Sequence, residues 1–311
     1  MKRLWLSMPR WLRNVVRAFL CLLLAVLLLV GAAWWYFHPS VDRTDGVTYG
    51  ERNGAPLTMD IVKPKDPNGR AIAVMVSGSW KSGEPGETPT WLMAPLLRRG
   101  YTVFAICHIS QPEATVMEII EDVHRGVRFV RCHADEHGID PDKIGVTGGS
   151  AGGHLSLMLA TTGGVGPADS ADELDQFSSE VQAVAIFYPV TDLLNLGAST
   201  ENAGDGGPPK SYLEAFGFLS GYTDLDADSW TKIGRDCSPI YFVDENLPPT
   251  LIHHGDADTL VPLEQSEWYR DRASKLGAEV KLVVEPGGGH GWLTMIYDVY
   301  KFGDWFDKHL R

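Results

Sequence analysis

Beyond residue 55, most of the chain consists of strand-like apolar segments that alternate with helix-like segments. Residues 57–62 alternate apolar and polar side chains, which is typical of a half-buried strand. Continuous apolar runs, as in strands covered on both faces, occupy residues 71–76, 101–107, 143–147, 181–187, 249–254 and 280–284. Segments with helical character lie between or after them, over residues 90–99, 113–137, 154–160, 263–276 and 293–310. The alternation predicts an α/β protein with a mostly parallel sheet covered by helices on both faces.

The first 38 residues have a different character. Residues 18–37 carry no charge, end in four consecutive aromatic residues, and follow a basic stretch without acidic residues. About 20 apolar residues can span a bilayer, with the aromatic cluster at the far interface and the positive charges on the cytoplasmic side. A cleaved signal peptide is the alternative, because residues 31–33 offer a small-residue cleavage site. The aromatic extension favours a retained anchor, and both interpretations place residues 39–311 outside the cytoplasm.

Three stretches of the body lack either pattern. Residues 38–55 are polar and rich in turn-forming residues, and we expect a linker and domain entry there. Residues 161–180 are loop-like. Residues 191–248 interrupt the alternation with glycine and proline, and we interpret them as a cap-like insertion.

Composition and charge narrow the class of partner. The chain has 311 residues, of which 44% are hydrophobic and 22% charged, as in one large globular domain. Five of its 27 basic residues precede residue 38, so the body carries 22 basic against 40 acidic residues. Such an acidic body argues against nucleic acid or anionic lipid as a partner. Its three cysteines, Cys107, Cys132 and Cys237, form no disulfide framework; one bridge is an alternative, but three free, mostly buried thiols are expected.

The sequence Gly148-Gly149-Ser150-Ala151-Gly152 lies between a predicted strand and a predicted helix. This is the context of a nucleophile elbow, a sharp turn that exposes a serine hydroxyl. Gly148, Gly149 and Gly152 leave room for the strained turn, and the following helix directs its free N–H groups towards Ser150. The alternative is a glycine-rich helix start with Ser150 as an ordinary cap. The motif alone does not separate the two interpretations, so the choice depends on residues elsewhere in the chain.

A nucleophilic serine needs an adjacent base, and the base needs an orienting carboxylate. Asp258 follows the strand at residues 249–254, and His290 follows the strand at residues 280–284. Ser150, Asp258 and His290 therefore occur in the order and in the loops that an α/β-hydrolase requires. This agreement supports the elbow interpretation much more strongly than the G-x-S-x-G pattern alone.

From about residue 50 onwards the chain resembles α/β-hydrolases of the carboxylesterase and acetyl-xylan or feruloyl esterase type. It is also similar to the catalytic domain of prolyl-oligopeptidase-like proteins. The resemblance rests on Asp140-Pro141-Asp142-Lys143-Ile144, the elbow, and the stretches at residues 248–252, 254–262 and 288–291. It implies an α/β-hydrolase fold, no cofactor, and Asp258 rather than Asp256 as the acid of the triad.

The chain departs from the family at the oxyanion loop, where H-G-G-G-W is replaced by Ser77-Gly78-Ser79-Trp80. An oxyanion hole needs backbone N–H groups, which small residues offer equally well. We expect donors from Gly78 or Ser79 together with Ala151. Trp80 and Trp292 flank the hole and the base, and they are either pocket walls or ordinary core residues.

Other histidines are expected to be structural. His133 and His137 have a helical spacing that can bind metal, but no third ligand is evident, so no metal is expected. His154 is expected to pack behind the elbow, and His253 and His254 to support the acid loop. Asp122 and His124 are expected to make structural hydrogen bonds.

The sequence thus predicts a serine hydrolase that cleaves short-chain carboxylic esters, with acylated carbohydrate as one candidate substrate. A prolyl-oligopeptidase-like peptidase is an alternative, although no β-propeller-sized region precedes the catalytic part. A catalytically weak binding module on the same fold is another, supported by the altered oxyanion loop alone. Fold does not determine function in this superfamily.

Overall fold

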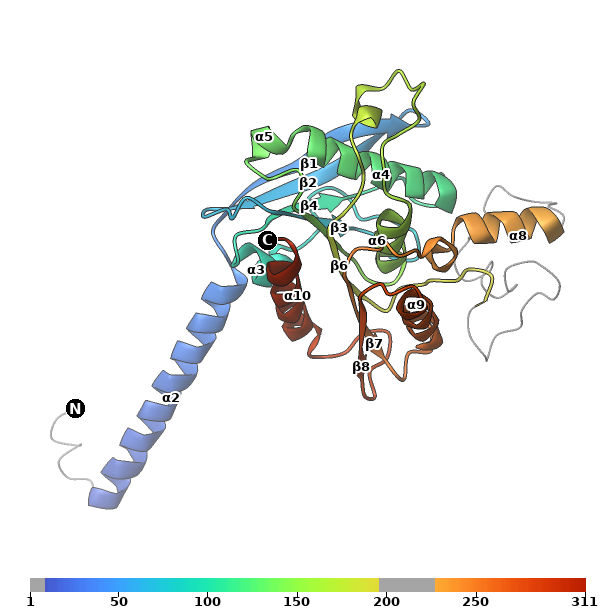
Figure 1. Cartoon of the computed structure of the whole chain (residues 1–311). Coiled ribbons are helices and arrows are strands. Elements are labelled where there is room, and N and C mark those ends of the chain that lie inside the picture. The colour runs from blue at the N-terminus through green and yellow to red at the C-terminus, as the bar shows by residue number, and fades with distance from the viewer. Residues whose placement is uncertain (1–8, 196–226) are drawn as a thin grey trace.

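The computed structural model describes residues 9–195 and 227–311 as an α/β layered body carrying a long N-terminal helix (Figure 1). The eight-stranded sheet has the order β1-β2-β4-β3-β5-β6-β7-β8. Its strands from β4 to β8 are parallel, whereas β1 and β2 are antiparallel at one edge. The predicted mostly parallel sheet is therefore confirmed. The strands are β1 (Val41–Arg52), β2 (Ala55–Pro64), β3 (Ala71–Met75), β4 (Thr102–Ile106), β5 (Ile144–Thr147), β6 (Ala183–Phe187), β7 (Thr250–Gly255) and β8 (Val280–Glu285).

Helices cover both faces of this sheet. Successive residues of β3 belong to different apolar clusters. Ala73 belongs to the cluster under α4 and α6, and Ile72 belongs to the cluster under α3 and α10. This division follows from the two-residue period of a strand, which sends successive side chains to opposite faces. The helices of the body are α3 (Thr90–Leu97), α4 (Val116–Cys132), α5 (Ala134–His137), α6 (Ala151–Thr162), α8 (Ala227–Asp236), α9 (Glu264–Lys275) and α10 (Met295–His309).

The prediction of a linker over residues 38–55 is wrong, because most of this stretch is β1. β1 pairs antiparallel with β2 and ends the sheet. Its exposed, charged side chains show no hydrophobic alternation, which is common in edge strands. Polar contacts attach it instead: Arg43 donates to the buried carboxylate of Asp60 at 3.0 Å, and Arg52 donates to Asp122 at 2.7 Å.

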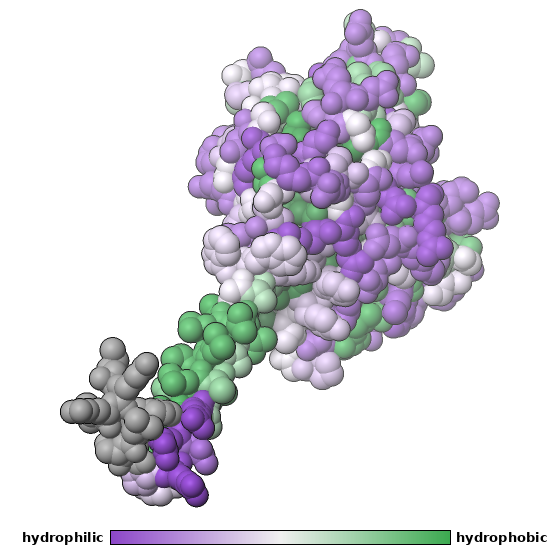
Figure 2. All heavy atoms as spheres, turned by 90° about the vertical axis from the view of Figure 1, so that its left-hand side faces the viewer, coloured by the Kyte–Doolittle hydropathy of each residue, from purple (hydrophilic) through white to green (hydrophobic). Residues whose placement is uncertain are grey.

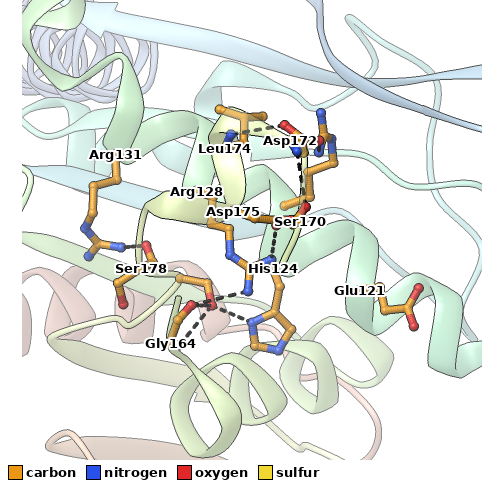
Figure 3. A network of polar contacts seen from close by, with 12 residues as sticks. Glu121, His124, Arg128, Arg131, Gly164, Ser170, Asp172, Leu174, Asp175 and Ser178 are labelled. Atoms are coloured by element: carbon orange, nitrogen blue, oxygen red, sulfur yellow. Dashed lines mark hydrogen bonds and ion pairs between the residues drawn. The ribbon is translucent and has the colours of Figure 1, made fainter. Parts of the chain in front are cut away.

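Beyond Thr162, where α6 ends, the loop predicted at residues 161–180 contains only the short 3-10 helix η1 (Glu173–Gln176). Figure 3 shows side chains of α4 reaching into this loop. Arg128 donates to the Gly164 carbonyl and to Asp175, Arg131 donates to the Ser178 carbonyl, and His124 bonds the Ser179 hydroxyl. The irregular backbone is therefore held by side chains of the helix beneath it.

The N-terminal helix α2 (Arg10–Phe37) projects from the body, and its apolar surface is visible in Figure 2. No residue of α2 is buried in the protein, and none beyond Arg17 carries a charge. Length and composition suffice for α2 to cross a membrane, and a signal sequence near an N-terminus has the same character.

The predicted insertion at residues 191–248 lies largely outside the described residues. Its described part consists of residues 191–195, α8, the 3-10 helix η2 (Pro239–Phe242) and the segment up to β7. Ser238 at the start of η2 accepts the Leu193 N–H and donates to the Gly234 carbonyl. The two ends of the insertion are therefore joined to each other beside the sheet.

Candidate active site

Ser150 occupies a sharp turn between β5 and α6. Its backbone has φ 56° and ψ −121°, a strained conformation that a serine adopts only under strong local constraint. The neighbouring glycines are sterically required. A Cβ at Gly148 would lie 2.5 Å from the backbone of Gly152, and a Cβ at Gly152 would lie 2.6 Å from the Met75 carbonyl oxygen. The predicted elbow geometry is present.

The structure brings Ser150, His290 and Asp258 together. The Ser150 Oγ lies 3.0 Å from His290 Nε2, and His290 Nδ1 lies 2.8 Å from an oxygen of Asp258. The three residues come from loops after β5, β7 and β8, which are parallel strands whose carboxyl ends meet at one edge of the sheet. Their arrangement is that of a nucleophile, a base and an orienting acid.

The carboxylate of Asp258 is buried but well supplied with hydrogen bonds. One oxygen accepts the N–H groups of Leu260 and Val261, each at 2.9 Å, and the other lies near His254 and His290. Burial alone would raise the pKa of Asp258, yet these hydrogen bonds hold the pKa below its ordinary value. Asp258 therefore stays ionised beside His290 across the neutral pH range.

Asp256 differs from Asp258 in its exposure and in its hydrogen-bond partner. It is exposed, and it accepts the Gly287 N–H at 2.6 Å. This contact ties the loop after β7 to the loop after β8. Its position fits the prediction that Asp256 is a loop residue.

The structure leaves one of the two candidate donors in the oxyanion loop available. The Gly78 N–H donates to the Lys81 carbonyl at 2.9 Å, so it is already engaged. In the part of the chain that the structure describes, the N–H groups of Ser79 and Ala151 have no partner. Ala151 is the first residue of α6, and the first N–H groups of an α-helix have no partner within the helix. Ser79 and Ala151 are therefore the pair available to bind an oxyanion.

Of the two alternatives for Trp80, the structure favours the core residue over the pocket wall. Its side chain is fully buried, and its Nε1 donates to His154 Nδ1 at 3.1 Å. His154 Nε2 in turn donates to the Cys237 carbonyl at 2.6 Å. The bulky indole fills the space behind the oxyanion loop and connects it to α6.

Two polar residues that the sequence reasoning passed over brace the same loop. His108 accepts from the Ser77 hydroxyl at 2.9 Å and donates to the Ile109 carbonyl, while Gln111 donates to the Ser79 carbonyl at 2.7 Å. Their only sequence signal is their position directly after the strand at residues 101–107.

Tyr188 is a further residue of the site to which the sequence reasoning gave no role. Its ring centroid lies 4.4 Å from that of His290, and its backbone has φ 31°. The half-buried Trp292, whose ring lies 6.0 Å from Tyr188, donates to Asp298 at 2.7 Å. Tyr188 directly follows a predicted strand at the edge that carries the triad, which is the signal that could have identified it.

The remaining polar candidates have structural contacts. His133 stacks on Phe129 and bonds its carbonyl, and no group of three metal-ligating side chains occurs in residues 9–195 and 227–311. His254 bonds the Ser266 hydroxyl and the Val261 carbonyl, which supports the acid loop as predicted. His253 lies 3.3 Å from Asp298. The described cysteines are free thiols.

Acid should destabilise this fold through its buried neutral histidines. Burial lowers the pKa values of His108, His124 and His154 to about 4, against about 6.5 in the unfolded chain. Their contribution to stability is present above pH 6.5 and is lost as the pH falls towards 4, by about 1.4 kcal/mol per pH unit for each histidine. Melting temperatures of the detergent-solubilised chain at intervals from pH 7.5 to 4.5 should fall accordingly. A flat profile would contradict the assignment, and His124→Gln should lessen the slope.

The elbow, the parallel sheet and the ordered triad loops together define an α/β-hydrolase. Comparison with known proteins identifies the family, because the BD-FAE family model matches residues 59–272. The chain therefore belongs to the BD-FAE family of α/β-hydrolases.

Individual relatives are esterases. Esterase LipQ of Mycobacterium tuberculosis is 30% identical over 80% of this chain and 56% of its own length. A solved carbohydrate esterase from gut microbiota, in truncated form, is 27% identical with a TM-score of 0.71, covering 86% of this chain and 96% of that one. Thermogutta terrifontis esterase 2, solved with butyrate bound, is 26% identical with a TM-score of 0.63, covering 86% and 92%. The chain spans about half the length of the curated relatives it matches first.

Proposed function

We propose that the protein is a serine carboxylesterase whose catalytic domain comprises residues 39–311. The proposal rests on two consecutive hydrogen bonds. Ser150 Oγ lies 3.0 Å from His290 Nε2, and His290 Nδ1 lies 2.8 Å from the Asp258 carboxylate. The free N–H groups of Ser79 and Ala151 support it, since Ala151 directly follows Ser150 and the Ser77 carbonyl of the oxyanion loop accepts the Gly152 N–H at 3.2 Å.

In this proposal His290 Nε2 takes the hydroxyl proton of Ser150 while Oγ attacks the ester carbonyl. The tetrahedral oxyanion is stabilised by the N–H groups of Ser79 and Ala151. His290 then gives the proton to the leaving alkoxide, and an acyl-enzyme remains. A water molecule, deprotonated by His290, releases the acid and restores Ser150. Asp258 keeps the imidazole oriented and stabilises its charged form throughout.

Small acyl groups should be the preferred substrates. The Tyr188 ring crowds the space beside His290, and the solved relatives include a carbohydrate esterase and a butyrate-bound esterase. We expect kcat/KM to be highest for p-nitrophenyl acetate and to fall through butyrate and octanoate to laurate. A hydrophobic site discriminates by about 1–3 kcal/mol per methylene, so the decline should be graded.

Acetylated xylan tests the carbohydrate part of this proposal, with acetate release as the measurement. Feruloyl and aminoacyl esters serve as the comparison set for a bulkier acid and for a peptidase-like preference. A maximum at laurate without acetate release from xylan would instead indicate a lipase-like enzyme.

We further propose that α2 inserts in a membrane and holds the catalytic domain on the non-cytoplasmic side. The basic residues Arg10, Arg13 and Arg17 lie at its N-terminal end, and its C-terminal end carries the aromatic cluster. Protease added to intact spheroplasts should then degrade the domain, whereas a cytoplasmic marker protein stays intact. Protection of the domain until the membrane is permeabilised would reverse the topology.

A further inference from the structure

The last turn of α2 is attached to the body by specific contacts. Arg98, at the C-terminal end of α3, donates from Nε to the Tyr36 carbonyl at 3.1 Å and places its guanidinium 3.9 Å from the Trp35 ring centroid. α2 therefore ends against α3, which itself packs against α10, and the direction of α2 relative to the body is restrained.

The connection between α2 and the body is short. Only residues 38–40 separate Phe37 from β1, a reach of about 10 Å at most. The uncharged part of α2, residues 18–37, is about 30 Å long as a helix, which matches the hydrocarbon thickness of a bilayer. If this part spans a membrane, the bilayer surface lies at the aromatic end of α2. Because the connection is so short, the part of the body around that end must lie close to the bilayer surface.

The two helices next to this junction, α3 and α10, pack against each other and have large exposed apolar and aromatic side chains on them or just before them. Leu293, before α10, is 99% exposed, and Tyr297 and Tyr300 on α10 are 61% and 43% exposed. Trp91 and Leu92 of the neighbouring helix α3 are 48% and 41% exposed. Figure 2 shows that α2 leaves the body where the surface is paler, and so less hydrophilic, than much of the surrounding face.

Cations accompany these aromatic rings. Arg99 lies 4.3 Å from the Tyr300 ring centroid and Lys301 lies 5.0 Å from that of Tyr297, while the two tyrosine rings are parallel. Aromatic residues with flanking lysine and arginine are the side chains that favour the headgroup region of a membrane.

We propose that this face, formed by Trp91, Leu92, Leu293, Tyr297 and Tyr300, lies in the interfacial region of the bilayer that α2 spans. The inference rests on the proposed membrane insertion of α2. A zwitterionic lipid surface suits the face, since its apolar and aromatic groups need no anionic partner and the body as a whole is acidic. Leu293 is three residues beyond His290, so the docked face holds the loop of the catalytic base at the membrane surface.

Spin labels on the full-length chain in phosphatidylcholine nanodiscs test this placement. The background is Cys21→Ser with Cys132→Ser, because the other two cysteines are buried. Single labels are introduced by Leu293→Cys and Tyr297→Cys. Leu27→Cys marks the middle of α2, and Val165→Cys, 66% exposed in the loop before η1, is the matched aqueous control. Each label is scored by its collision rate with oxygen relative to that with a polar nickel complex.

We expect the ratio at residues 293 and 297 to exceed that at residue 165 several-fold while staying below that at residue 27. Ratios at 293 and 297 equal to the ratio at 165, with residue 27 embedded, would overturn the docked face and leave the anchor intact. An aqueous residue 27 would overturn both. A low ratio with spin–spin coupling between two copies would assign the face to a protein contact instead. Ester hydrolysis by each labelled sample reports separately on the catalytic proposal.

Discussion

Replacing Ser150 with alanine is expected to lower kcat on p-nitrophenyl acetate by about 10⁴-fold or more, because the acyl-enzyme route loses its nucleophile. His290→Ala should cost a similar factor, since Oγ then has no base within 3.0 Å. The double variant should be little worse than either single variant, because residues that act as one unit lose their effect together. Additive losses would mean that Ser150 and His290 act independently.

The two aspartates of the acid loop provide a matched control for this prediction. Asp258→Asn should reduce kcat by about 10⁴-fold, because an amide in place of the carboxylate favours the wrong imidazole tautomer. Asp256→Asn should retain most activity, because the amide oxygen can still accept the Gly287 N–H. An essential Asp256 with a dispensable Asp258 would show that the acid of the triad has been misassigned.

The buried strands of this fold are predictable because each is a continuous apolar run between turn signals. β1 escapes such a prediction, because an edge strand is held by backbone pairing with β2 and by ion pairs such as Arg43 with Asp60. These contacts lie within one hairpin, and its two-residue turn Asn53-Gly54, with φ 54° and 79°, is the local signal that could have predicted β1. For residues 191–248, the irregular composition indicates an insertion but not its path.

The triad residues are predictable for a different reason: chain order and strand ends place Ser150, Asp258 and His290 at one sheet edge. The oxyanion loop is less accessible to such reasoning. Whether Gly78 or Ser79 offers a free N–H depends on a turn that closes onto Lys81, and the burial of Trp80 depends on the space behind α6. Tyr188 likewise acquires its place beside His290 only when β6 stands between β5 and β7.

Ser79 and Trp80 both have positive φ, at 50° and 55°. Consecutive non-glycine residues in this region store about 1–3 kcal/mol of strain each, which the surroundings must hold. The fully buried Trp80 side chain, hydrogen-bonded to His154, is the group in position to hold it. In the same loop, the Ser79 N–H has no partner among the described residues.

Trp80→Ala should therefore lower the free energy of unfolding by about 3–5 kcal/mol and also reduce kcat, because the collapsed cavity no longer holds Ser79 in place. Trp80→Phe, which keeps most of the packing, should retain more activity and lose about 1–3 kcal/mol, because His154 Nδ1 loses its donor. Ser79→Gly should keep kcat close to that of the parent, since the donor belongs to the backbone and glycine tolerates positive φ. Urea unfolding and p-nitrophenyl acetate kinetics on the three variants give both readouts. If Trp80→Ala unfolds more easily but keeps its kcat, the indole supports the core without positioning the oxyanion loop.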